Sequence, residues 1–274
     1  MLVRNSLAAA CVFLAFASTT ALPCAFAADK HALALDDILR KLEENLQSYD
    51  KTVPAFFCDE HAVSEMFPGT PRDIVVTDSV FRVRREEAAD HSTRFVESRE
   101  VKPVNSGPAT SEAPDAPAVI EGIFEGALAV VSSSQQSCMR YDLRKQKNDA
   151  IVIDFKTVEH PPRSADCLLD EKAQGRAFVD PATLQIKRLE MTAPHHLIRD
   201  EQHRWAAPLK GEWVVSVDYA PVTLDGKSFW MPTAINSRVT SDPNTFHSQT
   251  WIFKARYSNY HRLEVSSRVL PVPQ

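Results

Sequence analysis

The sequence predicts an α+β fold in which a mostly antiparallel β sheet is half covered by two helices. Three observations predict this fold. Hydrophobic and polar residues alternate along most of the chain after Val53, an Asp-Gly pair at 225–226 separates two such runs, and two shorter segments have apolar residues at helical spacing. The chain contains 18 prolines and 7 glycines, which favours strands joined by stiff turns over a helical bundle.

Residues 1–27 have the features of a cleavable signal peptide. Arg4 precedes an apolar stretch from Leu7 to Phe16, and a small-residue segment ends in Ala25-Phe26-Ala27. The alternative is a membrane anchor, but an apolar stretch of about ten residues is too short to span a bilayer. We therefore expect residues 28–274 to form one exported domain, periplasmic or secreted, that does not span the membrane.

Composition and charge exclude several classes of protein. The chain has 274 residues, of which 44% are hydrophobic and 24% charged, as in ordinary globular proteins. A net charge of −5 and the absence of any run of Lys or Arg argue against nucleic acid as a partner.

The cysteines predict at most one disulfide. Cys11 and Cys24 fall in the predicted signal peptide, and lipoprotein processing at Cys24 is disfavoured by the proline before it. Three cysteines remain, Cys58, Cys138 and Cys167, and an oxidising compartment allows one bridge between them. We expect Cys138 to pair with Cys167 because each lies beside a strand-like run.

The first helix is expected over residues 31–49, with its acidic residues early and a break before Pro54. Its apolar stripe comprises Leu35, Ile38, Leu39, Leu42, Leu46 and Tyr49. The strands that follow alternate apolar and polar residues, which indicates one buried and one solvated face. Examples of the apolar positions are Phe81, Val83, Phe95, Met139, Tyr141, Leu143, Ile151, Ile153 and Phe155.

Turns and a second helix complete the prediction. Residues 180–183 (Asp-Pro-Ala-Thr) and the Asp-Gly pair at 225–226 are expected to be turns. Residues 103–118 are rich in Pro and Ala and predict a surface loop, either a lid or a spacer. Residues 119–131 predict a second helix, in which Gly122 and Gly126 either allow close approach to the sheet or only weaken the helix.

No catalytic or metal site is convincing in this sequence. Asp59 and His61 share one face of a strand but lack a second ligand cluster, so a solvated strand face is expected. His195, His196 and His203 lie close in sequence, but Pro194 and the charged residues nearby indicate an exposed loop. Because no known catalytic motif is present, we predict no enzyme, no metal and no cofactor.

Aromatic residues are concentrated in the last third of the chain. They form either a filled sheet core or one side of a cavity that accepts an apolar ligand, and periodicity alone does not distinguish the two. The candidate ligand-binding residues are Trp213, Val215, Val217, Tyr219, Trp251 and Phe253.

Two segments, residues 175–186 (GRAFVDPATLQI) and 217–232 (VDYAPVTLDGKSFWMP), carry a family resemblance. With the order of elements around them, they resemble the outer-membrane lipoprotein carrier fold, the LolA/LolB-like half-barrel. The resemblance implies an unclosed antiparallel β half-barrel with two covering helices over a cavity that accepts lipid or acyl chains. The arginine that latches lid to barrel in that family cannot be placed in this sequence, and the insertion at 103–118 is unusual.

Three functional hypotheses follow from these observations. The first is a non-enzymatic carrier or binding protein for a lipid, an acyl chain or a lipoprotein in the cell envelope. The second is an envelope sensor or scaffold that has a filled core and binds a protein partner. The third, an envelope hydrolase, needs a nucleophile and base that the sequence does not place together.

Overall fold

The computed structural model describes residues 34–67, 74–87, 93–103, 126–147, 150–162, 165–169, 172–197, 209–241 and 250–264. It contains a long helix, α1 (Leu35–Thr52), a four-residue helix, α2 (Gly126–Ala129), and a 3-10 turn, η2 (Ser133–Gln135). The strands are β1 (Phe56–Phe67), β2 (Ile74–Glu87), β3 (Thr93–Pro103), β4 (Met139–Lys147), β5 (Ala150–Thr157), β6 (Gln174–Val179), β7 (Ile186–Leu197), β8 (Leu209–Leu224), β9 (Lys227–Ser241) and β10 (Thr250–Arg262).

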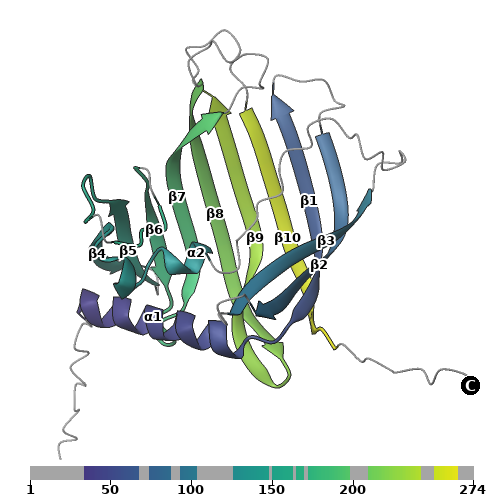
Figure 1. Ribbon diagram of the computed structural model, residues 1–274, viewed down its shortest axis with the longest axis horizontal. Helices are drawn as coiled ribbons and strands as arrows, with labels where there is room; N and C mark the ends of the chain where they lie inside the picture. Colours follow the sequence, from purple (N-terminus) through teal and green to yellow (C-terminus); the bar gives the residue numbers. More distant parts are fainter. Residues whose placement is uncertain are drawn as a thin grey trace, which may run out of the picture. The chain divides into compact units, whose positions relative to one another are not determined.

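These strands form one antiparallel sheet in the order β3-β2-β1-β10-β9-β8-β7-β6-β5-β4 (Figure 1). Strand β1 pairs with β10, from Phe56 opposite Arg262 to Phe67 opposite Thr250, so the first and last described strands are neighbours inside the sheet. Strands β3 and β4 are its two edges. The described strands thus form an open, β-dominated sheet, and the prediction of an unclosed antiparallel sheet is confirmed.

The period-two alternation divides the sheet into two faces. The inner face packs on α1 and carries the core, whereas the outer face is turned away from α1. In β5, for example, Ile153 and Phe155 are buried on the inner face, and Asp154 and Lys156 lie on the outer face. Each large apolar side chain buried in this way contributes roughly 1.5–3 kcal/mol relative to exposure.

Helix α1 crosses the inner face from the β4 side to the β2 side. Near its start the Asp36 carboxylate accepts a hydrogen bond of 3.1 Å from the Gln136 amide, and near its end Arg85 of β2 donates to the Lys51 carbonyl at 3.2 Å. The helix stops at Thr52, as expected from the following proline. Four of the six residues of the predicted stripe are buried, Ile38, Leu39, Leu42 and Tyr49, and Leu35 and Leu46 are partly exposed.

Both predicted turns are confirmed. The Asp180 carboxylate accepts hydrogen bonds from the backbone N–H groups of Ala182 and Thr183 at 3.0 and 2.9 Å, and these bonds lower the pKa of Asp180. Asp225 and Gly226 have φ angles of 52° and 74°, the positive values that a type I′ hairpin turn needs at both central positions.

The prediction of two covering helices is not supported by the described residues. Within residues 126–131, the described part of the second predicted helix, only Gly126–Ala129 are helical. Val130 and Val131 leave the helix and are buried, and the Ser132 hydroxyl donates to the Ala129 carbonyl just after the turn. Consecutive β-branched residues followed by serines disfavour continuation of a helix. Residues 119–125 lie outside the described residues.

The prediction of an exposed loop around His195 and His196 is wrong. Both residues belong to β7 and pair with Gly211 and Lys210 of β8. Pro194 is tolerated there because the pairing of β7 with β6 ends at Thr192, two residues before the proline. At Pro194, β7 is therefore paired with β8 alone among the described strands, and prolines within sheets are confined to such edge positions. His203 lies outside the described residues.

The expected disulfide between Cys138 and Cys167 is present, and Cys58 is a buried free thiol. Gln135 reinforces the bridge, since its amide nitrogen donates to the Asp166 carbonyl and its amide oxygen accepts from the Leu168 N–H group, both at 3.1 Å. The segment around Cys167 is thereby held against η2, next to the start of edge strand β4.

Two further sequence predictions fall outside the described residues. They are the signal peptide at 1–27 and, apart from Pro103 at the end of β3, the loop at 103–118. None of the helices in the described residues is long and apolar enough to cross a membrane.

Candidate functional site

The six predicted ligand-binding residues all lie on the inner face, on strands β8 and β10. Val215, Val217, Tyr219 and Phe253 are 6, 2, 5 and 7% exposed and belong to the core. Trp213 and Trp251 are half-buried, and Val239 of β9 lies between them because it pairs with both. The structure therefore separates the set into four core residues and two tryptophans with accessible surface.

Polar groups adjoin the two tryptophans on the inner face. The Trp213 indole N–H donates to the Ser237 hydroxyl at 2.8 Å. Ser64 and Ser237 both pair with Phe253, one from each neighbouring strand, so they share a row next to the tryptophan row. The Ser64 hydroxyl is buried and has no hydrogen-bond partner among the described residues. Such a group is costly to bury, and a bound polar group or water would satisfy it.

Helix α1 contacts the sheet at the end of the strands that lies away from the two tryptophans. The Tyr49 hydroxyl lies 3.2 Å from the Met231 sulfur, and the Asn45 amide donates to the Leu184 carbonyl at 2.7 Å. Met231 pairs with Ala220, the residue after Tyr219. At a rise of 3.3 Å per residue, Tyr219 lies about 20 Å along β8 from Trp213. The tryptophan row is thus distant from these contacts with α1.

A buried ion pair lies on the inner face near edge strand β3. The Arg99 Nε–H group donates to both carboxylate oxygens of Glu60, at 3.1 and 2.9 Å, and the Tyr257 hydroxyl donates to Glu60 at 2.7 Å. The Arg99 guanidinium also lies 4.4 Å above the ring centre of Phe81. These contacts satisfy a carboxylate that would otherwise be very costly to bury.

Burial also changes the acidity of groups on this face. It raises the pKa of the Cys58 thiol to about 12 and raises the pKa of Tyr219 well above its ordinary range. The Tyr219 hydroxyl has no hydrogen-bond partner among the described residues. A thiol with so high a pKa is a poor nucleophile at neutral pH.

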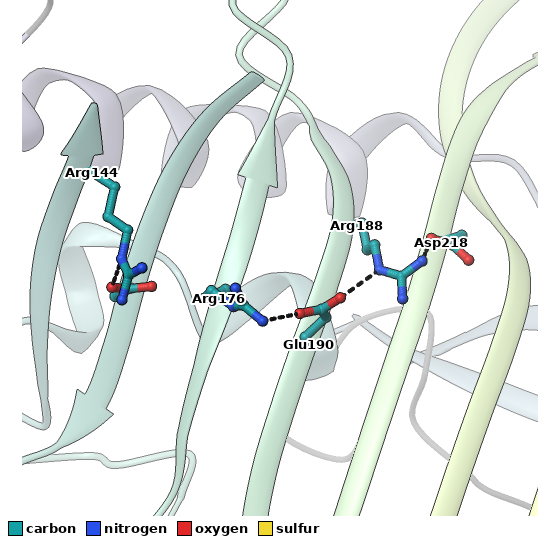
Figure 2. Close-up of polar contacts among 6 residues, drawn as sticks. Arg144, Arg176, Arg188, Glu190 and Asp218 are labelled. Carbon is teal, nitrogen blue, oxygen red and sulfur yellow. Dashed lines mark hydrogen bonds and ion pairs between the residues drawn. The ribbon is translucent and has the colours of Figure 1, made fainter. Parts of the chain in front are cut away.

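The outer face carries ion pairs between adjacent strands (Figure 2). Glu190 of β7 lies between two arginines, accepting from Arg176 of β6 at 3.0 Å and from Arg188 of its own strand at 2.9 Å. Arg188 also donates to Asp218 of β8 at 3.1 Å. Arg144 of β4 pairs with Asp154 of β5. Helix α1 passes behind the strands in this view, so these pairs lie on the face turned away from it.

Two adjoining grooves open on this outer face. The first has a volume of about 630 Å³ and is lined by the Arg144–Asp154 pair, Arg176, Arg188 and Glu190. The second has a volume of about 810 Å³ and includes residues of β5, β6, β7 and β8. Four residues line both grooves: Arg140, Lys156, Gln174 and Thr192.

The metal-site candidates remain apart. Asp59 and His61 share the outer face of β1, as expected, but His61 is hydrogen-bonded to Asp78 at 2.7 Å and Asp59 accepts from Asn259 at 2.7 Å. Among the described residues, no group of three or more His, Cys, Asp or Glu side chains is placed to hold a metal ion.

Sequence reasoning missed the Glu60–Arg99 pair and the outer-face grooves. Alternation along residues 59–61 places the Glu60 side chain on the face opposite to those of Asp59 and His61. An inward carboxylate could therefore have been inferred, because Phe56, Cys58 and Ala62 on the same face are buried. Its partner could not, because Arg99 reaches Glu60 only through the order of strands β3, β2 and β1.

No protein-family model matches the chain, and no curated protein matches its sequence. Solved structures similar to the chain include these two. One is an outer membrane lipoprotein-sorting protein domain from Vibrio parahaemolyticus, at 9% identity and a TM-score of 0.36, covering 80% of this chain and 90% of that chain. The other is a DUF1329 family protein from Desulfovibrio piger, at 10% identity and a TM-score of 0.36, covering 81% of this chain and 91% of that chain.

The chain is similar to an outer membrane lipoprotein-sorting protein domain over about four fifths of its length.

Proposed function

We propose that this chain is an exported, non-enzymatic binding protein or carrier for a lipid or acyl chain in the cell envelope. The observation that supports the proposal is the row Trp251–Val239–Trp213. It lies on the apolar face of an open sheet, yet its two tryptophans are half-buried where the neighbouring core residues are almost inaccessible. Hydrophobic and aromatic side chains with accessible surface are the groups that predominantly line the binding sites of small apolar ligands.

The polar groups near this row suit one end of an amphipathic ligand. Ser64 has an unpartnered buried hydroxyl, and the Ser237 hydroxyl accepts from Trp213. A carboxyl or ester group of a lipid would satisfy Ser64 while its hydrocarbon chain contacts Trp213 and Trp251. In this proposal Val215, Val217, Tyr219 and Phe253 form the floor beneath the ligand.

A second candidate is the envelope sensor or scaffold with a filled core. It is favoured by the low exposure of Val215, Val217, Tyr219 and Phe253, which already pack against other residues of the chain. In that case the tryptophan row would contact a protein partner, and no small apolar ligand would bind.

The test is native mass spectrometry of residues 28–274 purified from an exporting host, followed by titration with a fluorescent fatty acid. We expect a co-purifying lipid, and expect Trp213→Ser with Trp251→Ser to abolish probe binding while circular dichroism stays unchanged. Trp230→Ser is the matched control, because Trp230 is a half-buried tryptophan near the 225–226 turn, away from the row. A chain that carries no lipid and binds no probe would favour the second candidate.

A further inference from the structure

One row of the outer face places two cations side by side. Arg140 of β4 is directly opposite Lys156 of β5, Lys156 is opposite Gln174 of β6, and Gln174 is opposite Thr192 of β7. Directly opposite residues have Cβ atoms about 5 Å apart, so the four side chains rise from neighbouring points. These are the four residues shared by the two grooves.

Most carboxylates near this row are already paired. Asp154 pairs with Arg144, and Glu190 is shared by two arginines. Arg140 has Asp142 at 3.6 Å, with both side chains about two-thirds exposed. Lys156 has no ion-pair partner among the described residues. Like charges directly opposite each other on adjacent strands are destabilising, so an anion bound between Arg140 and Lys156 would relieve their repulsion.

The groove has hydrogen-bond donors in excess of acceptors. Five basic side chains and three acidic ones line the first groove, a net charge of +2. The two grooves together have six basic and five acidic side chains, a net charge of +1 in a chain whose net charge is −5. An arginine has five N–H donors, and the pairs described here occupy only some of them. Gln174 and Thr192 add neutral donors beside Lys156. Such a set of donors suits the oxygens of a phosphoryl group.

We propose that the junction of the two grooves binds a phosphoryl group, carried by a soluble phosphate ester or by a lipid headgroup. Lys156 and Arg140 neutralise its charge, and Gln174 and Thr192 donate hydrogen bonds to its oxygens. This site lies on the face opposite the tryptophan row, so it stands or falls independently of the proposed apolar ligand.

The test is an NMR titration of the ¹⁵N-labelled chain (residues 28–274) at low salt with inorganic phosphate and glycerol 3-phosphate. We expect the amide signals of Gln174 and Thr192 to shift, and expect the shift to weaken as salt is added. Arg140→Gln with Lys156→Gln should lower the affinity about tenfold. Arg256→Gln is the matched control, since it removes an exposed outer-face charge on β10, outside both grooves, and should change the affinity less than about twofold.

Flotation with vesicles distinguishes the two sources of the phosphoryl group. Capture by phosphatidic acid vesicles, but not by phosphatidylcholine vesicles, supports a headgroup if the double variant loses it. Shifts with glycerol 3-phosphate without vesicle capture support a soluble ester. The proposal is overturned if Gln174 and Thr192 do not shift with either soluble probe and no vesicle captures the chain. Equal affinities of the double variant and the unmodified chain would also overturn it.

Discussion

Glu60 and Arg99 form an ion pair inside the core, with Nε and Oε2 2.9 Å apart and side chains 2 and 10% exposed. Arg99 belongs to edge strand β3 and Glu60 to β1, so the pair reaches across β2, where the ring of Phe81 supports the guanidinium. An edge strand with one neighbour is thereby attached to a second strand by a side-chain contact.

Glu60→Gln is expected to lower the free energy of unfolding by about 3–5 kcal/mol, because it leaves the Arg99 guanidinium buried with its nearest carboxylate removed. Urea denaturation monitored by circular dichroism measures the loss. The control is Glu100→Gln, which breaks the exposed Arg82–Glu100 pair between β2 and β3, where Glu100 is 57% exposed. That change should cost less than about 1 kcal/mol. Equal losses in both variants would mean that burial of the Glu60 pair has no energetic effect.

Two tyrosines should respond in opposite ways to loss of the hydroxyl. Tyr257→Phe removes a donor to the Glu60 carboxylate and should cost about 1.5–3 kcal/mol. Tyr219→Phe removes a buried hydroxyl without a partner among the described residues and should be neutral or stabilise by about 1 kcal/mol. Urea denaturation of the two variants side by side tests the contrast. A loss for Tyr219→Phe as large as that for Tyr257→Phe would contradict it.

Stability should fall in alkaline solution. Burial raises the pKa of Cys58 from 9.0 to about 12, so the unfolded chain loses this proton at a lower pH than the folded chain does. The contribution of the Cys58 thiol to the free energy of unfolding is therefore complete below about pH 9 and is lost as the pH rises toward 12. Urea denaturation between pH 8 and pH 11 should show the decline, with a shallower slope for Cys58→Ala. A slope unchanged by that substitution would exclude Cys58 as a cause.

The Cys138–Cys167 disulfide joins residues 29 positions apart, and its loss should cost about 3–4 kcal/mol through the entropy of the unfolded chain. The measurement is urea denaturation with and without dithiothreitol. Cys138→Ser with Cys167→Ser should reproduce the effect of the reductant and respond no further to it. An additional effect of dithiothreitol on that variant would point to a different pairing.

Gly175 is expected to tolerate no side chain. A Cβ atom there would lie 2.0 Å from the Glu190 carbonyl oxygen and 2.5 Å from a ring carbon of Phe155. Gly175→Ala should therefore cost about 3 kcal/mol in urea denaturation. Gly226→Ala is a useful comparison, because the added Cβ atom would lie in open space and the strain would come from the positive φ of 74°. This change should lower the free energy of unfolding by about 1 kcal/mol. The reverse order of these losses would contradict the clash.

The sequence predicted the features that depend on local patterns. Alternation placed Trp213 and Trp251 on the apolar face, and the spacing in residues 31–49 predicted α1. The failures have physical reasons. Pro194 suggested a loop, because only the register of β7 against β6 shows that the proline lies beyond the last pair of these two strands. The partner of Glu60 and the cation opposite Lys156 become apparent only from the order of the strands.

The pairing of β1 with β10 has a consequence for folding kinetics. Asp59 and Asn259 are hydrogen-bonded neighbours although they are 200 residues apart in sequence. Contacts of such high contact order form slowly, because a long loop must close before any pairing energy is gained. During synthesis, β1 lacks one of its two neighbours until nearly the whole chain has been made. A chain that stops before β10 leaves β1 and β9 as additional open edges, where aggregation begins.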